Sequence, residues 1–329
     1  MKNKFLKCMG LAIVSLVVPL CAACNAEDDS GKLKIVTSIY PEYDWVMTVL
    51  GDKKDDAKVT MLRDNGVDIH SYTPSFEDTK NISNCDLLVY VGGESDDWID
   101  DTLKDALNKD MKVINLLETL GDAAKAEELV PGMQGEEEEE EGEKGEEEEV
   151  EYDEHVWLSV KNAQVFVKAI SDTLGEIDSK NADYYKGNAD AYINQLKDLD
   201  AKYTKAVEDG SKDTLVFADR FPFRYMVEDY SLNYYAAFLG CAAVSDIDFT
   251  TIKFLADKID ELGLKVILKI EGKTGEGFAE SVKDTAQSKD LKVLTMDSIQ
   301  SAKSSNFESG KTYLSIMESN LEVLKEALR

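Results

Sequence analysis

The chain has 329 residues and a formal net charge of −29, with 66 acidic residues against 37 lysines and arginines. An acidic balance of this size argues against binding to nucleic acid or to an anionic membrane surface. The length is sufficient for two lobes that each bury a core of their own.

The N-terminal 23 residues predict an export signal. Three lysines precede an apolar run over 10–20 that is too short to span a bilayer. The small residues directly before Cys24 resemble the lipobox of bacterial lipoproteins, in which the cysteine carries lipid, palmitate included, after cleavage. Cys21 stands where that motif usually has leucine, and a secreted protein cut at a small-residue site is the alternative. We expect a lipid anchor on Cys24 and a location at the cell membrane, facing outside the cytoplasm.

An N-terminal lobe is expected over 24–159. Short apolar, β-branched runs alternate there with stretches of helical period, which is typical of α/β units around a parallel sheet. The pattern predicts strands over 33–40, 57–62, 86–92 and 111–116, and helices over 43–50, 76–83 and 97–108.

A glutamate-rich segment lies near the end of this lobe. From Asp122 to Glu154 there are 17 acids against two lysines, so this segment carries −15 of the net charge of −29. Such a run repels itself and buries nothing, and we expect a solvated, disordered loop at about 132–151. The loop could gather cations weakly by long-range attraction or serve as a solubilising spacer, and the sequence leaves both roles open.

The rest of the chain predicts a connector and a second lobe. Apolar residues recur at helical spacing over 160–207, which indicates a connecting helix in one piece or two. The C-terminal lobe over 208–329 repeats the first scheme. Its expected strands cover 214–218, 234–238, 265–270 and 292–296, and its expected helices cover 222–230, 250–262, 277–288 and 313–328. The predicted fold class is α/β, with two lobes that each hold a parallel sheet flanked by helices, joined by a long connecting helix.

Two cysteines remain once the signal is removed and Cys24 is lipidated. Cys85 and Cys241 lie far apart in the sequence and form neither a disulfide framework nor a Cys-x-x-Cys pattern. Both stand beside apolar strand residues. We interpret them as buried free thiols.

The only two histidines share a similar setting. One lies in Asp-Ile-His-Ser-Tyr at 68–72, and the other lies in Asp-Glu-His-Val-Trp at 153–157. Histidine is the commonest protein ligand for transition metals, and an adjacent carboxylate can bind the ion or orient the ring. The repetition favours one shared site, and two unrelated histidines are the alternative.

Acidic residues follow several of the predicted strands. His70 comes after the strand at 57–62, while Asp219, Glu271 and Asp297 each follow a strand of the second lobe. In open parallel sheets, ligands bind beyond the carboxyl ends of the strands. Acids are also common there as helix caps, so each one alone proves little. Together with both histidines they favour a metal site in a cleft between the lobes.

The motifs resemble the metal-binding solute receptors of bacterial ABC importers, the zinc and manganese group. Residues 68–74 are similar to that family's Asp-Pro-His-Ser-Tyr-Glu-Pro segment, and residues 153–159 are similar to its Asp-Pro-His-x-Trp-Leu-Ser segment. The resemblance covers essentially the whole mature chain. It implies that a divalent ion is captured outside the cell and passed to an ABC permease by a monomer. It also implies His70, His155 and Asp297 as metal ligands.

The chain departs from the family pattern after the first strand of the second lobe. The family usually places a third histidine or a glutamate there, and Ala218 stands in that place without a donor atom. Asp219 is the nearest carboxylate, Arg220 beside it could neutralise an acid or repel a cation, and Glu271 is a ligand or a support for one. Two imidazoles with one or two carboxylates suit Zn²⁺, which we favour, and also Mn²⁺.

A metal-dependent hydrolase with a two-histidine, one-carboxylate site is the main alternative function. The chain has no His-Glu-x-x-His helix and no nucleophile motif, although Glu154 or Glu271 could act as a base. A surface adhesin or a structural lipoprotein is a third class. We therefore expect a binding protein rather than an enzyme, with no nucleic-acid partner.

Overall fold

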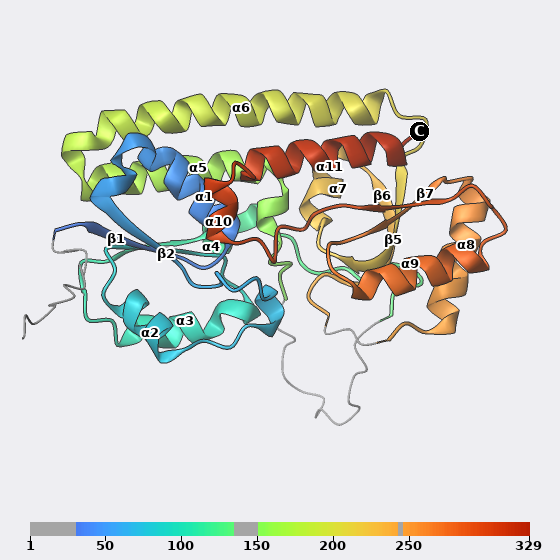
Figure 1. The fold of residues 1–329 in the computed structure, drawn as a ribbon, viewed down its shortest axis with the longest axis horizontal. Coiled ribbons are helices and arrows are strands. Elements are labelled where there is room, and N and C mark those ends of the chain that lie inside the picture. Colours follow the sequence, from blue (N-terminus) through green and yellow to red (C-terminus); the bar gives the residue numbers. More distant parts are fainter. Residues whose placement is uncertain (1–30, 135–150, 243–245) are drawn as a thin grey trace, which may run out of the picture. The chain divides into compact units, whose positions relative to one another are not determined.

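A computed structural model describes residues 31–134, 151–242 and 246–329. The predicted signal, the lipidation site and most of the glutamate-rich loop lie outside the described residues. The unit from Lys32 to Arg329 contains two four-stranded parallel sheets with helices around them (Figure 1). The predicted α/β class with two lobes is thereby confirmed, while the exact lobe boundaries stay predictions. Among the described helices, none has the length and apolar character needed to cross a membrane.

The first sheet has the strand order β2-β1-β3-β4. Successive residues of β1 face opposite sides, because side chains alternate along a strand. Ile35 packs into the core under α1, and Val36 packs into the core formed with α2 and α3. The elements are β1 (Leu33–Thr37), β2 (Ala57–Met61), β3 (Leu87–Tyr90), β4 (Lys112–Asn115), α1 (Tyr40–Leu50), α2 (Phe76–Ser83), α3 (Asp97–Lys104) and α4 (Leu116–Leu120).

The second sheet has the equivalent order β6-β5-β7-β8. Val216 of β5 faces the core formed with α8 and α9, while Leu215 and Phe217 face the larger core that also includes α11. The elements are β5 (Thr214–Phe221), β6 (Asn233–Leu239), β7 (Val266–Lys269), β8 (Lys292–Thr295), α7 (Arg224–Tyr230), α8 (Phe249–Leu262), α9 (Thr274–Thr285), α10 (Ser304–Glu308) and α11 (Tyr313–Ala327).

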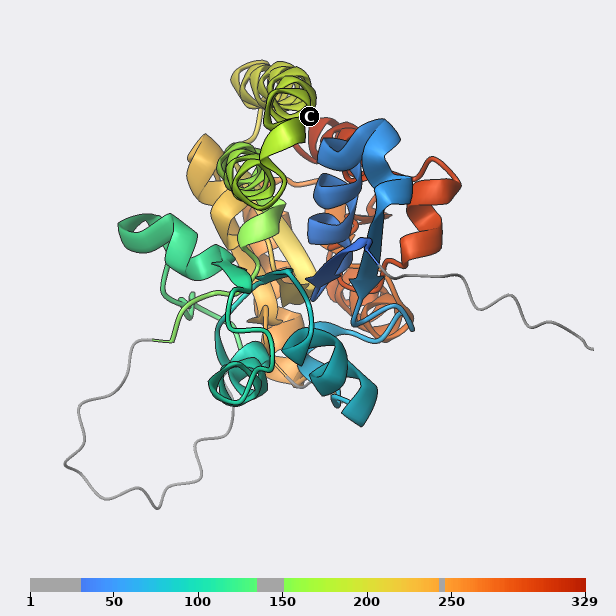
Figure 2. The ribbon, with the colours of Figure 1, turned by 90° about the vertical axis from the view of Figure 1, so that its left-hand side faces the viewer.

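The connector consists of two helices, α5 (Val160–Ile177) and α6 (Ala182–Glu208). The Ser159 side chain accepts a hydrogen bond from the Asn162 N–H at 2.9 Å, which caps the start of α5. Figures 1 and 2 both place α6 alongside α5 and α11. One continuous apolar core runs from α1 through both connector helices to α11, so it joins the two sheets.

Local differences from the predicted elements have simple causes. Helix α1 begins at Tyr40 rather than 43, because Pro41 in its first turn needs no hydrogen-bonding N–H. Helix α3 ends at Lys104, since the chain turns and the Leu107 N–H donates to the Ser83 carbonyl at 2.9 Å. The short helices α4 and α10 were not predicted.

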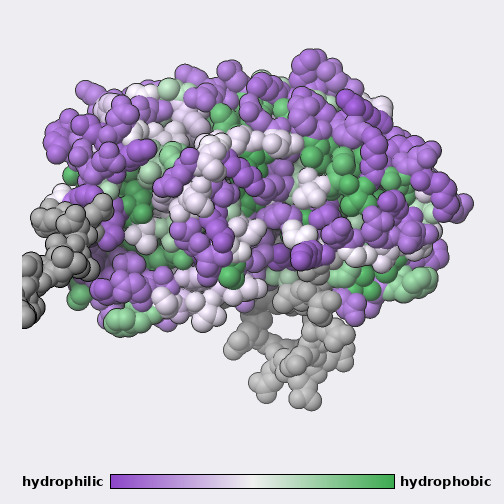
Figure 3. All heavy atoms as spheres, in the orientation of Figure 1, coloured by the Kyte–Doolittle hydropathy of each residue, from purple (hydrophilic) through white to green (hydrophobic). Residues whose placement is uncertain are grey.

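Hydrophilic residues cover most of the face seen in Figure 3, with smaller hydrophobic areas between them. The acids and lysines of the exposed helices form many pairs three or four residues apart, such as Lys186 with Asp190. Exposed pairs of this kind contribute little stability each. The buried apolar core therefore carries most of the stability.

One carboxylate is buried where the first lobe meets the connector. The Asp44 carboxylate is fully buried and accepts hydrogen bonds from the Tyr40 hydroxyl at 3.3 Å and from the Tyr192 hydroxyl at 3.4 Å. Burial raises the pKa of Asp44 from 3.8 to about 7. The folded protein therefore holds a proton on Asp44, at pH values between these two, that the unfolded chain releases.

We expect Asp44→Asn to remove the pH-dependent contribution that Asp44 makes to the free energy of unfolding. The wild type should lose stability as the pH rises from about 4 to about 7, and the variant should lose less over the same range. At pH 8 the variant should therefore be more stable than the wild type, by up to about 4 kcal/mol. Urea unfolding of the Lys32–Arg329 segment across this pH range measures the difference. Asp55→Asn, an exposed site with the same charge change, is the control, and equal pH profiles for both variants would contradict the prediction.

Candidate metal centre

His70 lies in the loop after β2, as predicted, within a single 3₁₀ turn at Ile69–Ser71. The Asp68 carboxylate holds this turn, because it accepts a hydrogen bond from the His70 N–H at 3.1 Å. Its other oxygen forms an ion pair with Arg220 of β5 at 2.5 Å. The loop that carries His70 is therefore fixed to the second lobe by a charge pair.

His155 comes directly before the connector and is fully buried. One carboxylate oxygen of Asp153 accepts hydrogen bonds from the His155 N–H at 2.8 Å and from its ring Nδ1 at 3.0 Å. The ring packs beside Trp157, with centroids 5.2 Å apart. Gly240, just after β6, lies so close that an added Cβ would be 2.7 Å from His155 Cε1. The position and orientation of the imidazole are thus set from several sides.

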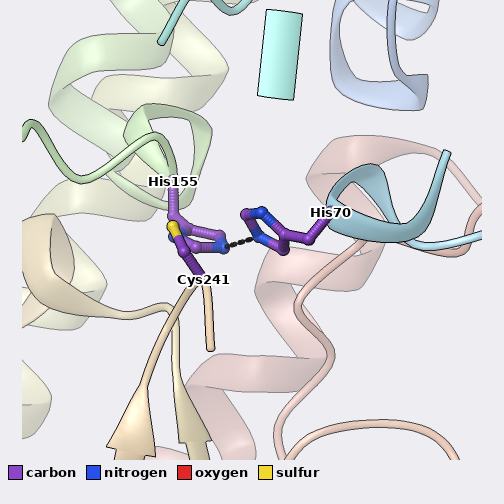
Figure 4. A group of neighbouring side chains, drawn as sticks. All are labelled: His70, His155 and Cys241. Atoms are coloured by element: carbon purple, nitrogen blue, oxygen red, sulfur yellow. Dashed lines mark hydrogen bonds between the residues drawn. The ribbon is translucent and has the colours of Figure 1, made fainter. Parts of the chain in front are cut away.

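The two imidazoles point toward one another (Figure 4), with their Nε2 atoms 3.2 Å apart. The His155 tautomer that donates its Nδ1–H to the Asp153 carboxylate carries a lone pair on Nε2. His70 Nδ1 lies 2.9 Å from Ser95 Oγ, and the tautomer that donates there also turns a lone pair toward His155. In a tetrahedral zinc site with Zn–N distances of about 2.0–2.1 Å, two nitrogens lie about 3.3–3.4 Å apart. The observed spacing fits a cation between the rings.

Electrostatics keep His70 in the form that binds metal. Burial, and then the neighbouring His155, lower the pKa of His70 to about 3, so that the ring is neutral at neutral pH. Glu154 lies beside it: one oxygen accepts a hydrogen bond from the Ser95 N–H at 2.7 Å, and the other lies 3.6 Å from His70 Nδ1. Burial raises the pKa of Glu154 to about 7.

Cys241 lies close to the two histidines. Potential ligand atoms of His70, His155 and Cys241 all lie within 4.8 Å of one another, the one such group of three or more histidine, cysteine or acidic side chains in the described residues. The sequence interpretation as a simple buried thiol is incomplete, because the Cys241 side chain is only partly buried and lies beside the imidazoles (Figure 4). Nothing in its sequence neighbourhood signalled this, since the contact forms only when β6 ends next to His155.

The structure places Asp219 away from the histidine pair. It lies within β5, which runs on to Phe221, rather than after the strand. Its carboxylate accepts hydrogen bonds from the Arg220 N–H at 2.9 Å and from the Ile270 N–H at 3.1 Å, and it packs against Gly275. The carboxylate thus satisfies backbone groups between β5 and β7, and it does not join the metal-ligand group.

Glu271 and Asp297 both hold the loop after β8. The Glu271 carboxylate accepts hydrogen bonds from the Ser298 N–H and hydroxyl, each at 2.7 Å, and burial raises its pKa. Asp297 accepts a hydrogen bond from the Ile299 N–H at 2.9 Å and pairs with Lys311 at 3.0 Å. Neither carboxylate belongs to the group formed by the imidazoles and Cys241.

The same loop contains two features that the sequence did not reveal. Ile299 has a positive φ of 65°, which is strained for a β-branched residue. Gln300 is 4 % exposed, and neither its amide nitrogen nor its amide oxygen has a hydrogen-bond partner. Unsatisfied buried amides cost free energy and are uncommon in native folds. The loop after β8 thus stores strain near Ser298, whose carbonyl accepts a hydrogen bond from the Trp157 indole at 2.9 Å.

Comparisons with known proteins identify relatives of this chain. The model of the family described as the zinc-uptake complex component A, periplasmic, matches residues 35–327. The chain is 30 % identical to the high-affinity zinc uptake system protein ZnuA of Bacillus subtilis, with 98 % of each chain aligned. It is 28 % identical to the zinc-binding protein AdcA of Streptococcus pyogenes serotype M6, over 99 % of this chain but only 61 % of the relative's length.

A solved structure shares the fold as well. The Zn(II)-bound ZnuA-like domain of Streptococcus pneumoniae AdcA superimposes with a TM-score of 0.69 at 26 % identity, over 91 % of this chain and 99 % of that one. The family model spans nearly all of the described fold, including the segments that carry both histidines and Cys241. The chain therefore belongs to the family of the zinc-uptake complex component A.

Proposed function

We propose that this protein captures Zn²⁺ outside the cytoplasm and delivers it to an ABC permease. The observation that carries the proposal is the pair of imidazoles whose Nε2 atoms face each other at 3.2 Å, with His155 fully buried and the His70 side chain 10 % exposed. Each ring has its other nitrogen next to a polar partner, Asp153 or Ser95, which is the usual arrangement for metal-binding histidines. The names of the relatives, zinc-binding and zinc-uptake proteins, support zinc over manganese.

His70 and His155 form the centre of the proposed site. Asp297, Glu271 and Asp219 would first have to leave their present hydrogen bonds before they could reach an ion between the rings. We therefore assign them to the support of the surrounding loops. The ion is the cargo of the protein, so binding must be tight yet reversible.

The proposed location follows from the N-terminal sequence and from the relatives. One of them, in Streptococcus pneumoniae, is named a zinc-binding lipoprotein, and it is 29 % identical over 98 % of this chain. We propose that Cys24 carries the lipid and that the protein acts as a monomer beside the permease. The hydrolase alternative is not supported, because the family is one of substrate-binding components of importers.

Calorimetric titration of the Lys32–Arg329 segment tests the assignment of the imidazoles. We expect one Zn²⁺ to bind tightly, and His70→Ala or His155→Ala to weaken binding at least about 100-fold, because each removes a ligand. Asp297→Asn is the matched comparison and should change the affinity by only a few-fold. If Asp297→Asn lowered the Zn²⁺ affinity more than either histidine variant did, the carboxylate rather than the imidazoles would hold the ion.

Asp153 should act through the orientation of His155. Asp153→Ala leaves the His155 ring without its acceptor, and we expect zinc affinity to fall about 10- to 100-fold. Asp153→Asn keeps an acceptor oxygen at the same place and should lose much less. Competition with a chromophoric zinc chelator measures both, and equal losses would indicate that the charge of Asp153 matters rather than its hydrogen bond.

The glutamate runs at 136–141 and 146–149 should not contribute ligands. The segments on either side of them are held by bridges between Ala126 and Tyr152 and between Gln134 and Phe238. We expect replacement of all ten glutamates by serine to leave zinc affinity within roughly threefold at physiological salt, where charges are screened over about 8 Å. A loss comparable to that of His155→Ala in the same titration would place a ligand within the runs.

A further inference from the structure

Cys241 is the one potential ligand of the centre that comes from the second sheet. His70 follows β2 of the first sheet, and His155 precedes the connector, whereas Cys241 follows β6. Its Sγ belongs to the group whose ligand atoms lie within 4.8 Å of one another. For a tetrahedral zinc with a Zn–S distance of about 2.3 Å, sulfur and nitrogen ligands lie about 3.6 Å apart, so a small closing movement brings all three into contact with one ion.

The second sheet offers no other donor at the place where one would be expected. Ala218 lies within β5 and is fully buried in the core formed with α8 and α9. Asp219 next to it is engaged by backbone N–H groups. Gly240 leaves the space that lets Cys241 and His155 approach each other, because any side chain there would collide with the ring.

The surroundings of the thiol favour a cation. The carboxylates of Glu127, Glu154 and Asp153 lie close enough to Cys241 to act on it electrostatically. Cys85 provides the contrast, since it is fully buried in the core with α2 and α3, and its Sγ lies 3.3 Å from the Met111 sulfur. Cys85 thus packs like a hydrophobic side chain, whereas Cys241 lies beside two imidazoles and near several acids.

We infer that Cys241 binds the ion as a thiolate, the third protein ligand, and that it biases the centre toward Zn²⁺ against Mn²⁺. This inference rests on the proposed function. Binding forms a metal–sulfur bond and releases the thiol proton to solvent, with no change in oxidation state. Thiolate is a soft ligand that suits zinc, whereas manganese prefers carboxylate, carbonyl and water oxygens. The ion would then connect the two lobes directly.

Cobalt substitution tests the ligand. The Lys32–Arg329 segment contains no cysteine besides Cys85 and Cys241, so any thiolate-to-cobalt charge-transfer band in the near ultraviolet comes from one of the two. We expect the Co²⁺-loaded wild type and Cys85→Ala to show the band and Cys241→Ser to lack it. Absence of the band in the wild type, or its loss in Cys85→Ala alone, would overturn the inference.

Metal selectivity provides the second readout. Cys241→Ser and Cys241→Ala should each lower the affinity for zinc more than about tenfold and change the affinity for manganese less. The ratio of zinc affinity to manganese affinity should therefore fall. Circular dichroism confirms that the variants are folded. An unchanged zinc-to-manganese ratio would overturn the inference while leaving the proposed function intact, provided His155→Ala still abolishes binding. Failure of the wild type to bind zinc would instead contradict the proposed function itself.

Discussion

Two imidazole nitrogens face each other at 3.2 Å inside the protein, a spacing that fits two ligands of one metal ion. When both outer nitrogens carry the proton, two lone pairs face each other at this distance, and a cation between the rings would relieve their repulsion. The pKa of His70 is already lowered, so a proton is a poor occupant, whereas a divalent cation can bind both nitrogens. Much of the surrounding structure serves to hold these two rings in place.

The supports come from both lobes. Asp153 and Ser95 contact the outer nitrogens of the rings, and the ion pair between Asp68 and Arg220 connects the His70 turn to β5. Behind His155, the Trp157 indole donates to the Ser298 carbonyl, and the Tyr313 hydroxyl donates to the Trp157 carbonyl at 2.7 Å. The continuous core through α5, α6 and α11 makes this framework stiff. A site shared by two lobes gains its rigidity from such cross-connections.

Acidic residues near strand ends can bind a metal ion or can hold neighbouring loops through hydrogen bonds. Asp219, Glu271 and Asp297 stand where a metal ligand would be plausible, yet each accepts hydrogen bonds from backbone N–H groups of nearby loops. A carboxylate at such a position can bind a cation or accept backbone hydrogen bonds, and in this structure all three accept backbone hydrogen bonds. Cys241 shows the reverse, because a residue with an unremarkable sequence neighbourhood lies beside the two histidines.

Sequence reasoning predicted the strands of both described sheets, the two-lobed α/β plan and the proximity of the two histidines. These follow from local patterns: the alternation of apolar runs, the strand-end rule and the repeated Asp-x-His frames. The surroundings of the rings follow from the tertiary fold, because β6 ends beside His155 although the two lie more than 80 residues apart in the chain. Which polar atoms face the ion depends on side-chain directions and backbone hydrogen bonds, and a one-residue shift such as that between Ala218 and Asp219 turns a side chain to the opposite face of a strand.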